Sequence, residues 1–217
     1  PEPPPTVPSA PHAAGPLQFH HQRVYVSGMD SCGEQHQAGV RTLLPESPGG
    51  QSLAQTTDAT PGPEKQATII GRPAVLHHRT ALQVQSMIDR LQEHADIVYA
   101  PVSDTAPQSA VPVQWGSPQP GATFQAPSSC AARHIIAYKP QHGTGYLSQG
   151  STGCGVLLVQ GDLVIQGDFT WYGTVLVTGT VHLTSGGRKH VTGGMVVAGG
   201  LTLDDGGATH LLHCSEA

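Results

Sequence analysis

The chain has 217 residues, with abundant glycine (27) and proline (19) and only 12% charged residues. This composition excludes a large leucine-rich helical core and favours strands and turns joined by long irregular connections. The net charge is −5 and there are only three lysines, which argues against a nucleic-acid partner because phosphate binding needs a basic surface. No run of about 20 apolar residues is present, so the sequence predicts no membrane span.

The first segment, residues 1–16, contains seven prolines and is predicted to be an extended spacer. Since the sequence starts with Pro1 rather than methionine, we expect a processed N-terminus, and a membrane anchor could have preceded it. Attachment to a membrane is therefore expected only through such an anchor. Residues 17–140 are predicted to form an irregular α+β region that caps an end or a face of the repeats that follow.

Strands and one helix are predicted within this capping region. Alternating apolar and polar residues indicate a strand over residues 22–28, and short apolar runs indicate strands at 67–71 and 133–139. The proline-rich stretch 101–129 is predicted to be irregular. A helix over about residues 80–95 is predicted from apolar residues at helical spacing, namely Val84, Met87, Ile88, Leu91 and Ala95.

Residues 141–217 contain one pattern three times: a glycine, an apolar segment, a second glycine and another apolar segment. The first glycines are Gly155, Gly173 and Gly193, which lie 18 and 20 residues apart, and the second glycine follows six residues later in every copy. The apolar residues then fall in matching columns. We expect these residues to form a shared core: Leu157, Val159, Leu163, Ile165, Val175, Val177, Val181, Leu183, Met195, Val197, Leu201 and Leu203.

This repeat predicts a mainly β fold, a short β-solenoid (β-helix) of about three coils. A period of 18–20 residues is close to the length of one β-helix coil, and self-similarity at a fixed period indicates a solenoid. Glycine permits the sharp corner between two strands, and about three stacked coils are needed to bury an apolar face. Residues 208–214 could add a partial coil. A meandering antiparallel sheet or a small sandwich also explains short strands, but it does not explain the matching columns.

Cysteine usage bears on the compartment. The chain has four cysteines, an even number, together with little lysine and much Pro, Gly, Ser and Thr. This combination predicts one or two disulfides in an exported, extracytoplasmic protein, which could be on the cell surface, in a pilus or secreted. The alternative is four buried thiols in a cytosolic protein. Three complete pairings are open for the candidates Cys32, Cys130, Cys154 and Cys214.

Two groups of residues resemble chemical sites without completing one. His210, His213 and Cys214 could bind zinc or copper, but they lack a Cys-x-x-Cys partner, so surface histidines beside a disulfide-bonded Cys214 fit better. We therefore expect no metal and no cofactor. In the first repeat, Asp162 and Asp168 could act on a polysaccharide, as acidic residues do on successive coils of some β-helix enzymes.

The acidic residues do not repeat from coil to coil. Asp162 aligns with Thr180 and Gly200, which favours solvent-facing turn residues over a catalytic row. Trp171 and Tyr172 close the first repeat and could stack on a sugar if they are exposed, or pack against the edge of the coil. We predict no catalytic residues.

The glycine-rich repeat resembles the C-terminal module of bacterial pilus-assembly proteins of the PilX type. The likeness is specific over residues 153–203 and looser upstream, at "VYVSGMDSCG" and at "IIGRPAV" with the predicted helix. It implies the exposed part of an envelope or pilus-associated protein with an N-terminal membrane helix and no catalytic residues. The segments that carry it are Gly153–Gly155, Gly161–Leu163, Gly167–Trp171, Gly173 and Gly193–Val197.

Together these observations predict a non-enzymatic, extracytoplasmic structural domain of a pilus-associated or cell-surface assembly protein. It would act through contacts with other pilus or envelope proteins, or with copies of itself in an oligomer or filament. Two alternatives stay open. One is a carbohydrate-binding or polysaccharide-processing β-helix on the cell surface. The other is a self-assembling scaffold of the bactofilin type.

Overall fold

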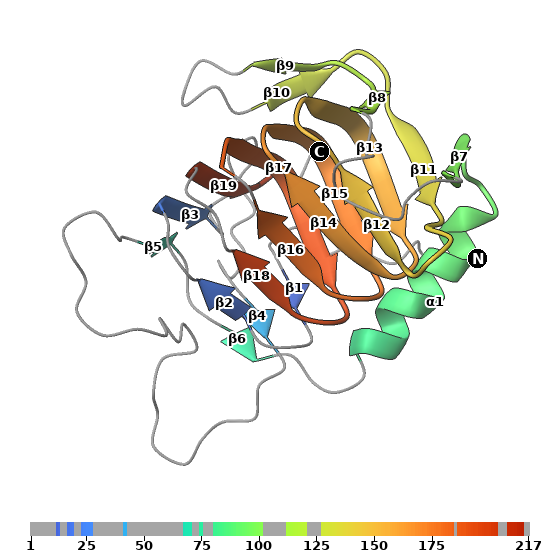
Figure 1. Cartoon of the computed structure of the whole chain (residues 1–217), viewed down its shortest axis with the longest axis horizontal. Coiled ribbons are helices and arrows are strands. Elements are labelled where there is room, and N and C mark those ends of the chain that lie inside the picture. The colour runs from blue at the N-terminus through green and yellow to red at the C-terminus, as the bar shows by residue number, and fades with distance from the viewer. Residues whose placement is uncertain are drawn as a thin grey trace.

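The structure of this protein is a computed structural model. It describes residues 12–13, 17–19, 23–27, 41–42, 67–70, 74–75, 80–101, 112–120, 127–184, 186–203 and 208–214. The described chain is mainly β and forms a parallel β-solenoid of about four turns, so the predicted fold class is confirmed. Figure 1 shows the coils stacked side by side, with one helix along their flank.

Each coil consists of a long strand with a bend, followed by a short strand. The long strands pair in one parallel sheet and the short ones in a second. We call the residues before the bend side 1, those after it side 2, and the short strands side 3. The strands are β11 (His134–Tyr138), β12 (Thr144–Leu147), β13 (Ser151–Val159), β14 (Asp162–Gln166), β15 (Phe169–Val177), β16 (Val181–Thr184), β17 (Arg188–Val197), β18 (Leu201–Leu203) and β19 (Ala208–His213).

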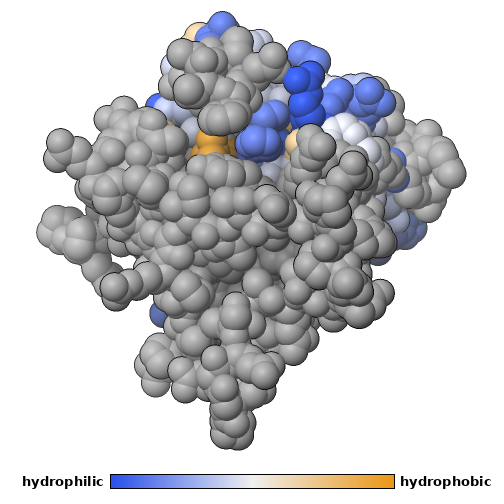
Figure 2. All heavy atoms as spheres, turned by 90° about the vertical axis from the view of Figure 1, so that its left-hand side faces the viewer, coloured by the Kyte–Doolittle hydropathy of each residue, from blue (hydrophilic) through white to orange (hydrophobic). Residues whose placement is uncertain are grey.

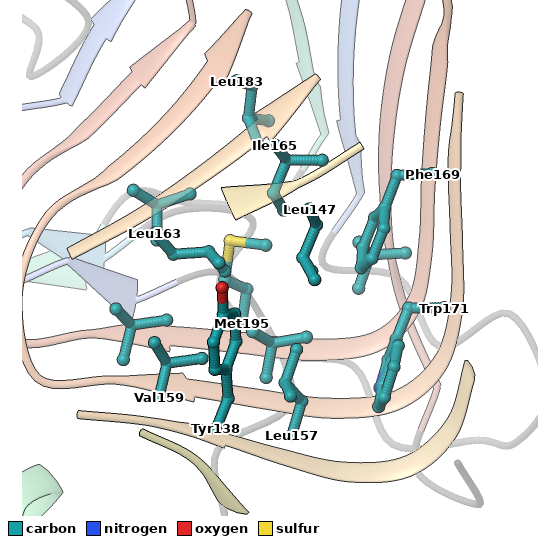
Figure 3. Packing of buried hydrophobic residues seen from close by; sticks show 14 of the residues in the cluster. Tyr138, Leu147, Leu157, Val159, Leu163, Ile165, Phe169, Trp171, Leu183 and Met195 are labelled. Atoms are coloured by element: carbon teal, nitrogen blue, oxygen red, sulfur yellow. The ribbon is translucent and has the colours of Figure 1, made fainter. Parts of the chain in front are cut away.

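The predicted columns are register partners in the structure. Leu157 pairs with Val175, which pairs with Met195, and the corner glycines Gly155 and Gly173 pair in the same way. Alternate side chains point inward, so one apolar interior runs through the coils (Figure 3). Of the twelve residues expected in the core, all but Leu203, whose side chain is outside the described part, belong to this buried cluster.

The solenoid begins earlier than residue 141, the predicted boundary. β11 and β12 form a coil in register with the next one, with His134 opposite Gly155 and Tyr138 opposite Val159. This coil lacks the glycine pattern because it packs differently. Gly145 lies where the next coil has a leucine, and a Cβ at Gly145 would approach the Tyr138 ring to 2.6 Å. A large residue and a small one have exchanged places, which hides the coil from column matching.

The N-terminal region is not only a cap, because its strands extend the same sheets. All of these pairings are parallel: β1 joins β17, β2 joins β18, and β3 joins β19; β4 then joins β1, β5 joins β3 and β6 joins β4. The predicted strands at 22–28 and 67–71 are therefore present as solenoid strands. The bounds are β1 (His12–Ala13), β2 (Leu17–Phe19), β3 (Arg23–Ser27), β4 (Arg41–Thr42), β5 (Ala67–Ile70) and β6 (Ala74–Val75). The predicted spacer, residues 1–16, lies otherwise outside the described residues.

Helix α1 (Thr80–Gln92) runs along side 2 and links its two ends. Val84 and Ile88 are fully buried against outward-facing residues of three successive strands, Leu158, Leu176 and Val196. The predicted helix continued to residue 95, but the chain turns at its end. The amide of His94 donates to the Leu91 carbonyl oxygen at 3.0 Å, and the strand β7 (Ile97–Tyr99) then pairs with β11.

Side 1 is covered by a hairpin that the sequence did not predict. β9 (Pro118–Pro120) and β10 (Pro127–Cys130) pair antiparallel in the stretch expected to be irregular, and they lie over β13, β15 and β17 (Figure 1). Just before them, β8 (Gln114–Trp115) pairs with β13. The hairpin and α1 thus cover two of the three sides.

Candidate functional site

The bends of β13 and β15 admit only glycine. Gly155 and Gly173 have φ of 106° and 130°, a region that L side chains avoid. A Cβ at Gly173 would also overlap the carbonyl oxygen of Gly155 in the preceding coil. The glycine-rich pattern is therefore explained by close approach of one coil to the next, and it needs no ligand to account for it.

The two aspartates of the first repeat join coils together. The Asp162 carboxylate accepts a hydrogen bond from the Thr180 amide at 2.7 Å, and the Asp168 carboxylate accepts one from the Arg188 amide at 2.7 Å. Both residues are half-buried, so they are not simply the solvent-facing turn residues that the sequence suggested. Each carboxylate binds a backbone amide of the following coil, which gives it a structural role.

The aromatic residues of the first repeat are inside the molecule. Trp171 is fully buried, and its indole Nε1 donates to the Gly155 carbonyl oxygen at 3.1 Å. It stacks on Phe169 with ring centroids 6.0 Å apart (Figure 3). Gly153 makes room for it, since a Cβ there would overlap the indole. Tyr172 is also buried, so neither ring is available to stack on a sugar.

A buried lysine occupies the interior of side 1. Lys189 is the register partner of Phe169, and its Nζ donates to the carbonyl oxygens of Thr184, at 3.0 Å, and of Gly186. Burial lowers the pKa of Lys189 to about 8, while the nearby charge of Asp168 acts in the opposite direction. The lysine holds the turn between β16 and β17 and is enclosed by the coil.

Next to the lysine, two histidines stack on the outer face of side 1. The rings of His190 and His210 have centroids 4.9 Å apart, and the buried His190 Nδ1 has no hydrogen-bond partner. Burial lowers the pKa of His190 to about 4, helped by His210 and Arg188 and opposed by Asp168; burial also lowers the pKa of His210. Within the described residues, no group of three or more His, Cys, Asp or Glu could hold a metal ion.

The residues weighed as a metal site are therefore not assembled into one in the described part of the chain. Cys214 is disulfide-bonded, His210 faces His190, and the side chain of His213 lies outside the described residues. A second disulfide joins Cys130 to Cys154, with Cα atoms 6.2 Å apart, and fixes the β9–β10 hairpin to β13. Cys32, the remaining candidate, is outside the described residues.

Side 3 has neither the hairpin nor α1 over it, as Figure 1 shows for β14, β16 and β18. Its outer face carries a column of half-buried residues in register, Tyr146, Val164, His182 and Thr202.

Figure 2 views the molecule from the end where β3 and β5 lie; most of the coloured atoms there are hydrophilic, around a small apolar area. Leu82 and Val98 are the large apolar side chains that are exposed in the described part.

Lys189 and the stacked histidines were not found from the sequence, although a signal was present. Counting back four residues from the corner glycines Gly173 and Gly193 aligns Phe169 with Lys189. This column lies before the corner glycine, outside the repeated pattern that follows each glycine. The two residues by which the second spacing exceeds the first lie between Thr184 and Lys189, in the turn whose carbonyls accept from the lysine.

No described helix combines the length and the apolar character that a membrane crossing requires. Comparison with known proteins identifies no relative: no protein-family model matches the chain, and neither a curated protein nor a solved structure is significantly similar to it.

Proposed function

We propose that this chain is a non-enzymatic, extracytoplasmic structural domain of a pilus-associated or cell-surface assembly protein, and that it acts through protein–protein contacts. The pilus part of the proposal rests on the likeness of residues 153–203 to the C-terminal module of PilX-type proteins. The part of the proposal that concerns a structural role rests on the stacked coils, whose parallel strands form a continuous repeat structure.

The observation that carries a structural role is how the coil side chains are used. Asp162 and Asp168 bind backbone amides, Trp171 and Lys189 are buried, and each forms hydrogen bonds within the coils. Groups that would serve catalysis or sugar binding are thereby committed to holding the coils together. This supports a structural domain over a polysaccharide-acting β-helix.

The disulfide between Cys130 and Cys154 supports the extracytoplasmic location. Disulfides persist in oxidising compartments and are rare in the cytosol. Here the disulfide attaches the β9–β10 hairpin to side 1, so the disulfide is part of the fold. We infer that the domain folds in such a compartment.

The test is to express the tagged chain, with its natural flanking sequence, in its source cells and to block thiols before lysis. We expect peptide mapping to recover Cys130 joined to Cys154, and the chain to copurify with sheared pili or with the envelope. A reduced chain in the cytosolic fraction would overturn the location. Depletion by a polysaccharide panel would favour the carbohydrate alternative. Filaments formed by the pure chain, without copurification of pilus or envelope components, would favour the bactofilin-type alternative.

A further inference from the structure

The last coil of the solenoid is completed by the other end of the chain. Along β17, β19 pairs with the side 1 half, residues 188–193, and does not continue onto side 2. On side 2 the strand next to β17 is β1, with His12 opposite Val196, and on side 3 the strand next to β18 is β2, with Gln18 opposite Thr202. β3 then stacks on β19, with Ser27 opposite Leu212. The N-terminal strands therefore follow the path that β19 begins.

These contacts have the geometry of one coil stacked on another. They are parallel and in register, as β15 is on β17, and they are made by backbone ladders at strand edges. Main-chain hydrogen bonds supply the affinity when a strand is added to a sheet edge, so the edge does not require its own chain as the donor. The few exposed large apolar side chains in the described part, Leu82 and Val98, offer no competing apolar interface.

The order of synthesis exposes this edge pairing to exchange. β1, β2 and β3 are synthesised before their partners, which lie within residues 196–212. Until those partners exist, the N-terminal strands have no edge of their own chain to join. A neighbouring chain whose own N-terminal strands have not yet docked presents the same edge. Repeat proteins characteristically exchange elements in this way, and an exchanged element makes the same contacts in either chain.

We propose that the edge formed by β18, β19 and the side 2 half of β17 is a strand-accepting site. It takes β1–β3, with β4–β6 stacked on them, from a second copy of this chain in place of the chain's own strands. Exchange of this kind links copies head to tail, or in reciprocal pairs. The inference deepens the proposed function by naming a second copy as a partner, and it rests on that function only in taking protein contacts as the role of the domain.

The test uses two full-length variants that are co-expressed, one with Gln18→Cys and the other with Thr202→Cys. These positions are register partners on side 3, and the described native cysteines are all in disulfides, so they do not compete for a thiol reagent. Only strand exchange brings the two new thiols of different chains together. With a short bifunctional thiol reagent, we expect a covalent dimer that contains one copy of each variant, in an amount that rises with expression level.

The matched control pairs Gln18→Cys with Val164→Cys. Val164 is on the same side, but three strands from Gln18, or about 14 Å, so exchange does not bring these thiols within reach. A chain with both Gln18→Cys and Thr202→Cys should cross-link within itself whenever its strands are not exchanged. Mixed dimers no more abundant than in the Val164→Cys control would overturn the proposal. Pilus copurification and the thiol state of Cys130 test the proposed function separately.

Discussion

The two halves of each long strand have the same backbone register but very different interiors. On side 2 the column of Leu157, Val175 and Met195 is entirely apolar. On side 1 the column that includes Phe169 continues with Lys189. Both columns pair strand by strand without a shift. The comparison teaches that the corner glycines and the backbone ladders set the register, whereas a column tolerates a polar residue if a nearby turn satisfies it.

The largest loss of stability is expected at Gly173, the corner glycine on which both side 1 and side 2 of the coil depend. Gly173→Ala would force an unfavourable φ and overlap the Gly155 carbonyl, which we expect to cost about 4 kcal/mol or more of unfolding free energy. Urea denaturation followed by circular dichroism measures this. Gly150→Ala is the matched control: its φ is 86°, but nothing lies within 4 Å of a Cβ there, so about 1 kcal/mol is expected. Equal losses at both glycines would contradict the role of coil-to-coil approach.

A smaller loss is expected from the apolar column alone. Leu157→Ala removes a fully buried side chain from side 2 and leaves a cavity between Ile136 and Val175, its register partners. We expect about 3 kcal/mol of destabilisation, from lost burial and from the cavity. The same urea titration applies, and Leu82→Ala on the exposed face of α1 is the control. A loss below about 1 kcal/mol would mean that side 2 is not a tightly packed interior.

The buried lysine gives side 1 a pH dependence. The pKa of Lys189 is lowered from 10.5 to about 8 in the folded chain, so between these values the unfolded chain binds the extra proton. Stability should therefore rise as pH increases from 8 to 10.5, by about 3 kcal/mol from this group. The measurement compares denaturation midpoints at pH 7.5 and 10.5 with those of Lys189→Met. A rise of the same size in Lys189→Met would assign the effect to other groups.

The smallest effect should be a gain in stability. Thr209 follows Lys189 in the same column and is fully buried, with its hydroxyl lacking a hydrogen-bond partner. Thr209→Val keeps the shape and removes the unsatisfied polar atom, so we expect an increase of about 1 kcal/mol. Thermal unfolding detects this as a higher midpoint. A lower midpoint would show that the hydroxyl is satisfied and that side 1 depends on it.

The part of the fold that repeats could be predicted, and the reason is physical. Stacked coils place equivalent residues in contact, so the sequence must repeat wherever the packing repeats, as at Gly155 and Gly173. The coil of β11 and β12 could not be predicted from the repeat, because Tyr138 fills the space that Gly145 leaves open. Compensation between two positions preserves the packed volume, but it breaks the pattern in each column taken alone.

The rest depends on contacts between distant segments. The pairing of β3 with β19 joins residues from opposite ends of the sequence, and a parallel edge accepts many short strands, so nothing in "RVYVS" specifies its partner. The hairpin over side 1 was hidden by its prolines, which usually indicate irregular structure. Among the candidate site residues, Trp171 could be exposed or packed as far as the sequence alone shows, because exposure is a property of the surrounding coils.

The path of α1 limits how this domain could grow. β6 and β7 lie at opposite ends of side 2, in the order β6-β4-β1-β17-β15-β13-β11-β7, which at about 4.8 Å per strand makes a distance of about 34 Å. The helix, with 13 residues, supplies about 20 Å of that distance. Duplicating one coil would push β6 and β7 apart by a further strand width, so α1 would need about three more residues to keep the chain connected. An ordinary solenoid can lengthen by copying a repeat, whereas here a gene duplication would have to be matched by an insertion in the helix.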